Sequence, residues 1–575
     1  MARQNEPTAM DALAAASKVI DTTNVASKTI EQDAKQAFSP QNWEEIAASV
    51  KQRVLDSIPK EYLIPADIAP PKDQRRVENF VRDSGFFSSE EVDITHSSAT
   101  QIHAKVLNKT WTAEQVIKAF SKSSAVAHQL TNVLTFADYP RALATAKTLD
   151  AEYAKTGKPR GPLHGIPISL KDNIQVKGAA STIGFVCYAN AIETEDGYLP
   201  KLLESLGAIV YVKTNVPTAM MMAETTNNLF GTTTNPLNRN LTPGGSSGGE
   251  SCLIAAHGSP LGVGTDIGGS VRIPSACTGL FALRPSAHRM PLLGFRTGMA
   301  GQESIPGVQG PLSTSLEDQV LYFKSVLDQK PWLHDSKLFP LPWCQEKFDN
   351  VPKKLKLGVI STDGYVNLTP PVKRALETTV EKLQAAGHEI ISFNDAPIMK
   401  CYALLACLFT VDGGKSITQQ IEAGNEPWPT GIKSFGQAQG VSAYDLWQMQ
   451  KEKAAVCKEW IDKFNSTGVD GLIVPTAPYI AAKHGGQTHV GYTGLFNLLD
   501  YSAANFPSGV VGDREKDVYP KDLAEALNPL DEATRKAYDA EEIHGLPVGL
   551  QIVGRRVEEE KVLGMVKRVL EAVKQ

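Results

Sequence analysis

Residues 242–275 read TPGGSSGGESCLIAAHGSPLGVGTDIGGSVRIPS and contain two glycine-rich runs, each of which carries a serine. Ser246 lies in the first run, GGSSGG, and Ser270 lies in the second, DIGGS. The segment between them, SCLIAAHGSPLGVG, predicts one helix and then a buried strand. Glycine beside a serine lets backbone N–H groups and a hydroxyl approach a bound molecule without obstruction by a Cβ atom. A single run of this kind is equally compatible with a plain tight turn.

A lysine follows an apolar run upstream of these serines. The stretch GPLHGIPISLKDN ends with Lys171, Asp172 and Asn173, and GIPISL predicts a buried strand that ends at the lysine. Burial disfavours the charged form of a lysine side chain and can lower its pKa by several units. Lys171 is therefore a candidate for a base that is neutral near pH 7.

The lysine motif and the two serine motifs together resemble those of the amidase signature family, serine hydrolases that use a lysine and two serines in place of histidine and aspartate. The resemblance runs from residue 90 to the C-terminus and includes the stretches 213–238 and 546–573. NNLFGTTTNP and LTPGGSSGGE are most similar to the fungal acetamidase-like branch. The stretch ALRPS, at 282–286, stands where many members have GLKPT, away from the three motifs.

The resemblance implies hydrolysis of a carboxylic amide without a cofactor or a metal. Ser270 is then the nucleophile, Lys171 the base and Ser246 the proton relay, with a cis peptide bond before Ser246. A helix that begins just after Ser270, with Pro274 near its start, would add positive potential. Amide hydrolysis also needs donors that stabilise the developing oxyanion. We expect these donors in the backbone N–H groups of the second glycine run: Ile267, Gly268, Gly269 and Ser270.

Other polar residues near the motifs are assigned structural roles. We expect Asp266 to brace the second serine loop by hydrogen bonding, and the resemblance implies the same for Arg272. Ser247 is compatible with assistance to the relay or with a plain loop position. His164 and His257 suggest a Ser–His pair, but no G-x-S-x-G motif accompanies them, so both are interpreted as structural histidines.

The substrate pocket is the least determined part of the site. Met220, Gly245 and Ser246 are the predicted substrate contacts. An apolar acyl pocket could also include Met221, Met222, Phe230 and segment 491–507, since methionine adapts to irregular shapes, and a plain core role is an equal alternative. The acetamidase-like stretches favour a small or medium neutral amide as the small-molecule partner, with esters and carbamates as further options.

Composition excludes several function classes. The chain has 575 residues and a net charge of −5, without the basic footprint of a nucleic-acid-binding protein. It has no leading secretory signal and no long apolar run, so we expect no transmembrane anchor and a cytoplasmic location. The seven cysteines are scattered without C-x-x-C pairs, which is typical of reduced thiols and not of a zinc site. A homodimer is left open.

The order of predicted elements indicates the architecture. Residues 1–85 are predicted to form an N-terminal helical arm and linker, with a helix over 42–58, and residues 86–575 the catalytic domain. Alternating strands and helices then favour an α/β fold, a mixed central β-sheet covered by helices on both faces. The charged segment 512–543 is expected to run over the surface.

Two other function classes stay open at this level. One is the glutamine-hydrolysing subunit of an amidotransferase that acts on charged transfer RNA, which has the same triad but needs partner subunits. The other is a non-catalytic binding protein on the same scaffold. A phosphate-binding loop is disfavoured because the glycine runs lack the G-K-[ST] ending.

Overall fold

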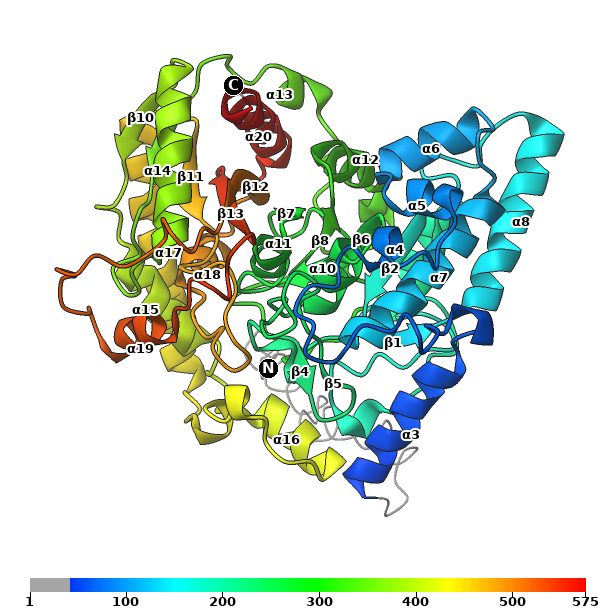
Figure 1. Cartoon of the computed structure of the whole chain (residues 1–575). Helices are drawn as coiled ribbons and strands as arrows, with labels where there is room; N and C mark the ends of the chain where they lie inside the picture. The colour runs from blue at the N-terminus through cyan, green and yellow to red at the C-terminus, as the bar shows by residue number, and fades with distance from the viewer. Residues whose placement is uncertain (1–41, 575) are drawn as a thin grey trace, which may run out of the picture.

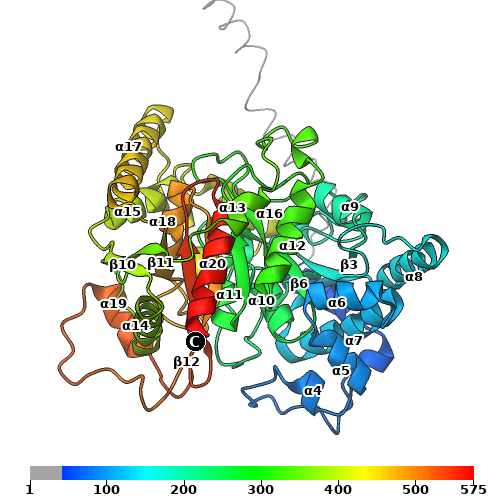
Figure 2. The ribbon, with the colours of Figure 1, turned by 90° about the horizontal axis from the view of Figure 1, so that it is seen from above.

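Eleven strands form one mixed sheet through the computed structural model, which describes residues 42–574. Helices cover both faces of this sheet (Figures 1 and 2), so the predicted fold class is confirmed. In spatial order the strands are β1 (Leu134–Ala137), β3 (Ile209–Thr214), β2 (Pro167–Lys171), β6 (Leu261–Asp266), β8 (Val308–Ser313), β7 (Phe281–Arg284), β12 (Ala503–Val511), β13 (Pro547–Val553), β11 (Gly471–Pro475), β9 (Lys356–Val359) and β10 (Glu389–Ser392).

The strands that carry the predicted motifs are parallel neighbours. β2 lies between β3 and β6 and runs parallel to both. Every residue of β2 is buried, as the apolar run before the lysine predicts. Lys171 is the last residue of β2 and Asp266 the last of β6. Because parallel strands end at the same edge of a sheet, the lysine and the second serine loop emerge side by side.

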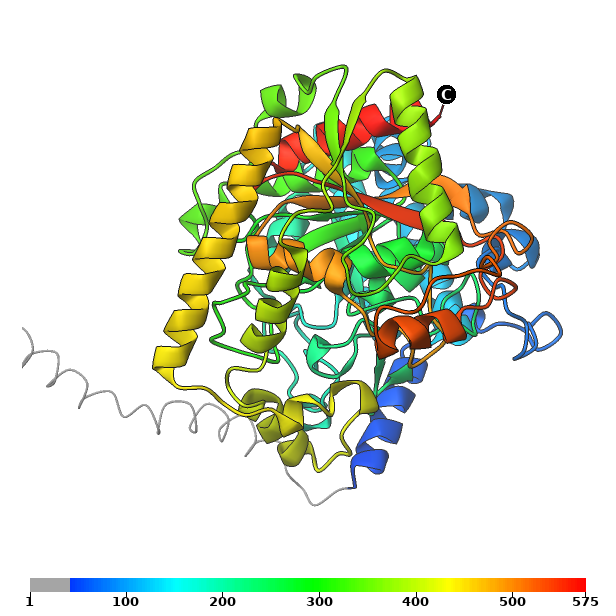
Figure 3. The ribbon, with the colours of Figure 1, turned by 90° about the vertical axis from the view of Figure 1, so that its left-hand side faces the viewer.

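Helices form where the sequence combines apolar periodicity with capping residues. α7 (Ala113–Thr131) begins with a capping box between Thr112 and Gln115, and α8 (Tyr139–Thr156) has a proline in its first turn and ends at Gly157. The other long helices include α12 (Leu316–Leu327), α14 (Pro370–Ala385), α17 (Ala443–Thr467) and α20 (Glu559–Val573). Figure 3 shows α17 along the outside of the molecule.

Helix α3 (Trp43–Asp56) is the first described helix and lies within the predicted range 42–58. Asn42 caps its N-terminus. Ala47, Val50 and Val54 are buried in a core that also contains residues of α7 and β1. This helix therefore packs onto the sheet. Residues 1–41 of the predicted arm lie outside the described residues, and the division of the chain at residue 85 stays a prediction.

The charged segment 512–543 runs over the surface, as predicted, and includes α19 (Pro529–Ala537) (Figure 1). Two buried aspartates attach it to the rest of the protein. Arg374 donates to Asp517 at 2.7 Å, and the amide of Asn367 donates to Asp531 at 2.8 Å. Within residues 42–574, the helices include none that is long and apolar enough to span a membrane.

Candidate active site

One strand end and two loops bring the predicted lysine and serines together. Lys171 ends β2, Ser246 lies just before α10 (Gly248–Ala255), and Ser270 lies between β6 and α11 (Arg272–Thr278). The predicted helix and strand between the two serines are thus α10 and β6. The predicted helix after Ser270 is α11, with Pro274 as its third residue. The peptide bond between Gly245 and Ser246 is cis.

The side chain of Lys171 is completely buried and hydrogen-bonded. Its Nζ lies 2.8 Å from the Oγ of Ser246 and 2.8 Å from the Oγ1 of Thr265, and it donates to the carbonyl of Thr265 at 3.3 Å. Burial lowers the pKa of Lys171 to about 7, although nearby carboxylates, Asp266 foremost, oppose the shift. A substantial fraction of the amine is therefore neutral at pH 7 and able to accept a proton from Ser246.

The hydroxyl of Ser270 faces a cavity. Ser270 is 9% exposed, and within residues 42–574 the structure shows no hydrogen bond from its Oγ, including none to Ser246. The loop 267–270, called here the nucleophile loop, offers backbone donors. The N–H of Gly269 donates to Asp266 at 2.8 Å, so three of the four predicted oxyanion donors remain unengaged by the described chain: the N–H groups of Ile267, Gly268 and Ser270.

A buried network holds the nucleophile loop. Besides Gly269, the carboxylate of Asp266 accepts from the N–H of Val271 at 3.2 Å, from the Nε of Arg272 at 3.0 Å and from the amide of Asn497 at 2.8 Å. Arg272 also donates to Gln551 at 3.0 Å. Burial opposes ionisation of Asp266, but the charge and hydrogen bonds of Arg272 outweigh it and hold the pKa of this carboxyl below its usual range.

The same contacts give Asp266 and Arg272 the bracing role that the sequence predicts. The hydroxyl of Ser247 exchanges hydrogen bonds of 3.2 Å with the N–H and carbonyl of Thr265, so it joins the two serine loops. His164 accepts from the N–H of Arg160 at 3.1 Å. His257 stacks on His96, with 3.8 Å between ring centroids. Both histidines contact neighbouring residues and neither is hydrogen-bonded to Ser246 or Ser270 in residues 42–574, and their structural role stays a prediction.

Four residues of this region escaped the sequence analysis: Thr265, Glu250, Asn497 and Gln551. Glu250 is buried behind the lysine strand, where it accepts from the hydroxyls of Ser169 at 2.6 Å and Thr214 at 2.5 Å. Burial raises the pKa of Glu250 to about 7. Its place in GGSSGGE, directly after the relay motif, is the one sequence signal that could have pointed to it.

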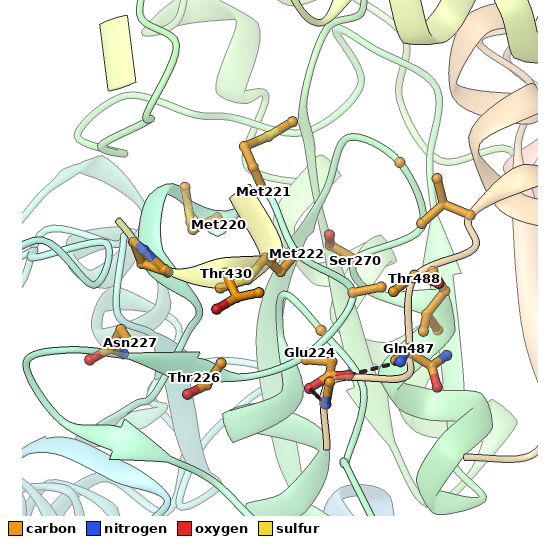
Figure 4. A pocket seen from close by; sticks show the side chains of 18 of the residues that line it. Met220, Met221, Met222, Glu224, Thr226, Asn227, Ser270, Thr430, Gln487 and Thr488 are labelled. Atoms are coloured by element: carbon orange, nitrogen blue, oxygen red, sulfur yellow. Dashed lines mark hydrogen bonds between the residues drawn. The ribbon is translucent and has the colours of Figure 1, made fainter. Parts of the chain in front are cut away.

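Two cavities meet at Ser270. The larger cavity has a volume of about 830 Å³ and the smaller one about 370 Å³, and Ser270, Ile267, Met220 and Met221 line both. Gly245 and Met222 line only the larger cavity, and Ser246 lines only the smaller one. Figure 4 shows the three methionines on one side of Ser270 and Gln487 and Thr488 on the other.

The structure separates the residues that the sequence could assign either to the substrate pocket or to the hydrophobic core. The three methionines line a cavity next to Ser270, as the pocket interpretation predicts. Phe230 and segment 491–507 belong to the hydrophobic core and line neither cavity at Ser270. In the described part of the chain, residues that commonly hold metal ions form no group of three or more.

Comparisons with known proteins agree with this geometry. A family model described as Amidase matches residues 115–563. An acetamidase from Emericella nidulans is 37% identical over 544 residues, covering 92% of this chain and 98% of the relative. Amidase 1 from Gibberella moniliformis is 40% identical over 466 residues, covering 80% and 89%.

A solved fatty acid amide hydrolase superposes with a TM-score of 0.89 at 32% identity, covering 93% of this chain and 96% of that chain. These matches define an enzyme that hydrolyses amides. The chain belongs to the amidase family, as the resemblance of its motifs predicts.

Proposed function

We propose that the protein hydrolyses a carboxylic amide through an acyl-enzyme on Ser270, with Lys171 as base and Ser246 as proton relay. The observation that carries the proposal is the 2.8 Å contact between the Nζ of Lys171 and the Oγ of Ser246. This contact lies in a buried site where the pKa of the lysine falls to about 7. Ser246 and Ser270 line one cavity, so a substrate can reach both hydroxyls.

In the first half of the reaction, the Oγ of Ser270 attacks the carbonyl carbon. Its proton passes to Ser246, whose own proton passes to the Nζ of Lys171. The oxyanion is stabilised by the free N–H groups of the nucleophile loop. The C–N bond then breaks, and the proton returns from Lys171 through Ser246 to the leaving nitrogen.

The second half repeats these transfers with water. Water loses a proton to Ser246, its oxygen attacks the ester carbonyl on Ser270, and the C–O bond to Ser270 breaks. The carboxylic acid leaves, and Ser270 regains its proton. The transfer between Ser246 and Ser270 requires the two hydroxyls to come into hydrogen-bonding contact when substrate binds, as often happens in active sites.

Intact mass after treatment with a fluorophosphonate tests the nucleophile. We expect one adduct on the wild type and none on Ser270→Ala. Ser275→Ala is the matched control, because Ser275 is also buried and its hydroxyl donates within α11 to the carbonyl of Val271 at 2.9 Å. Labelling of a folded Ser270→Ala variant would overturn the assignment.

The purified chain alone tests the alternative of an amidotransferase subunit. Hydrolysis of a simple amide without partner subunits supports the amidase proposal, and activity that needs glutamine and added subunits supports the alternative. A homodimer, a cytoplasmic location and a domain boundary at residue 85 are further predictions. Light scattering, imaging of a tagged chain and limited proteolysis test them in turn.

A further inference from the structure

Few charged side chains line the larger cavity at Ser270. Of the side chains that line it, Glu224 is the one carboxylate, and neither lysine nor arginine is present among the described lining residues. His484 is the other titratable group on its wall. The remaining polar lining is neutral, with threonines, asparagines and Gln487. A molecule in this cavity therefore meets the Glu224 side chain without a lysine or arginine among the described lining residues.

Glu224 is held in place by backbone groups. Its carboxylate accepts from the N–H of Gly485 at 2.9 Å and from the N–H of Gln487 at 2.8 Å, and the residue is 7% exposed. Within residues 42–574, no lysine, arginine or histidine pairs with it. A carboxylate has about four acceptor positions, so about two are not filled by the described chain. A buried charge without an opposite charge is costly, and a donor or cation brought by a ligand offsets that cost.

The position of Glu224 connects it to the reacting serines. A Cβ at Gly245 would collide with the backbone of Glu224, so Glu224 lies directly against the residue that precedes Ser246. Gly245, Glu224 and Ser270 all line the larger cavity. A substrate placed for attack by Ser270, with one substituent in this cavity, lies against the wall to which Glu224 contributes.

The rest of the wall suits a bulky apolar group. Met222, Phe409, Trp428 and Phe435 line the cavity, and its volume of about 830 Å³ is far more than an acetyl group fills. Aromatic faces and methionine sulfur also attract a cation at short range. The methionine and phenylalanine side chains offer a carboxylate no hydrogen-bond donor.

We propose that Glu224 is a specificity-determining residue. It selects amides whose substituent in the larger cavity is bulky and bears an ammonium group or another N–H or O–H donor. It rejects amides whose substituent there is anionic. This inference rests on the proposed amidase function. A purely structural role, in which Glu224 only fixes segment 485–487, is the alternative, and it predicts no dependence on substrate charge.

A matched substrate series tests the inference. Three phenylacetamides differ only in the para substituent: methyl, aminomethyl or carboxylate. A second series carries the same substituents on N-benzylacetamide, so that the charge is presented from either side of the amide. In at least one series, kcat/KM for the cationic amide should exceed that for the anionic amide by about 100-fold.

Variants of Glu224 separate charge from packing. Glu224→Gln should reduce this ratio at least about tenfold, and Glu224→Asp, which keeps the charge, should retain a clear preference. Asp318→Asn is the matched control. Asp318 is also buried and accepts from two backbone N–H groups, of Ala99 at 3.2 Å and of Thr100 at 2.8 Å, but it does not line the cavity. Its ratio should equal that of the wild type.

The outcomes distinguish failure of the inference from failure of the proposed function. Equal hydrolysis of cationic and anionic amides in both series, or an unchanged ratio in folded Glu224→Gln, overturns the inference. If Glu224→Gln does not fold, the wild type and Glu224→Asp decide. If no amide is hydrolysed and no fluorophosphonate adduct forms, the proposed function fails. The shift in unfolding temperature with each amide then tests the charge preference, and equal shifts overturn it.

Discussion

The Nζ atom of Lys171 lies 2.8 Å from the Oγ atom of Ser246, and both side chains are buried at the end of one strand and the start of one helix. A lysine can accept a proton from a serine only when the lysine is neutral. In the mechanism we propose, the ionisation of Lys171 therefore governs the reaction rate, and its pH dependence can be measured.

We expect kcat/KM to fall as the pH drops through about 7. The pKa of Lys171 is lowered to about 7 by burial, so the neutral base is lost below that pH. The measurement is a pH profile for a neutral amide under conditions in which chemistry limits the rate. A flat profile between pH 5 and 9 would count against Lys171 as the base.

Thr265→Val should move that profile to lower pH. The Oγ1 of Thr265 lies 2.8 Å from the Nζ of Lys171, where it accepts a hydrogen bond from the ammonium form. Loss of this acceptor disfavours the charged lysine, so the apparent pKa falls. We also expect kcat/KM to decrease about tenfold, because one orienting contact is lost. An inflection that stays in place or moves upward would contradict this account.

The stability of the wild type should rise with pH between about 7 and 10, relative to Lys171→Met. The pKa of Lys171 is about 7 in the folded state and about 10.4 when unfolded. The unfolded state therefore binds more protons in this interval, and the free energy of unfolding increases with pH. Denaturant titrations of both proteins across this pH range measure the difference in their free energies of unfolding. If the two free energies change with pH in parallel, the pKa of Lys171 is not lowered in the folded state.

Asp266→Asn should be costly for both stability and activity. The substitution removes the charge that pairs with the buried Arg272 and replaces one acceptor oxygen by an amide donor. Breaking a buried ion pair from one side typically costs about 3–5 kcal/mol. We expect a lower unfolding temperature and a loss of kcat/KM of at least about 100-fold. Full activity in a folded variant would show that the brace is dispensable.

Gly245→Ala should reduce activity more than Gly440→Ala. A Cβ at Gly245 meets the backbone of Glu224, so the loop that carries Ser246 must shift. At Gly440 the nearest atom would be 3.5 Å away, an ordinary contact. We expect kcat/KM to fall at least about 100-fold at Gly245 and to change little at Gly440. Similar values for the two variants would refute the close-contact argument.

The motifs, taken with their resemblance to the amidase signature family, predicted that Lys171, Ser246 and Ser270 lie in one site, and the structure brings Lys171 and Ser246 into contact. Each lies beside glycines or at the end of an apolar run, and these features act over a few residues. The parallel pairing of β2 with β6, which brings them to one edge, follows from the alternation of strands and helices. The number and order of the antiparallel strands beyond β6 could not be predicted, because no local pattern specifies which distant strands pair.

The supporting residues could not be predicted for a related reason. Asn497 and Gln551 hydrogen-bond the Asp266–Arg272 pair from more than 200 positions away in the chain. Glu224 reaches segment 485–487 across a similar separation. A single polar side chain in the sequence is most often solvated, so its burial becomes visible only when its distant partners are known.

The network around Asp266 is completed late in the synthesis of the polypeptide. Residues on α18 (Gly491–Leu499) and β13 tie down the nucleophile loop. A nascent chain that has completed both serine motifs still lacks these anchors until Asn497 and Gln551 have been synthesised and have paired with Arg272. The nucleophile loop therefore reaches its final arrangement only after β13 has joined the sheet.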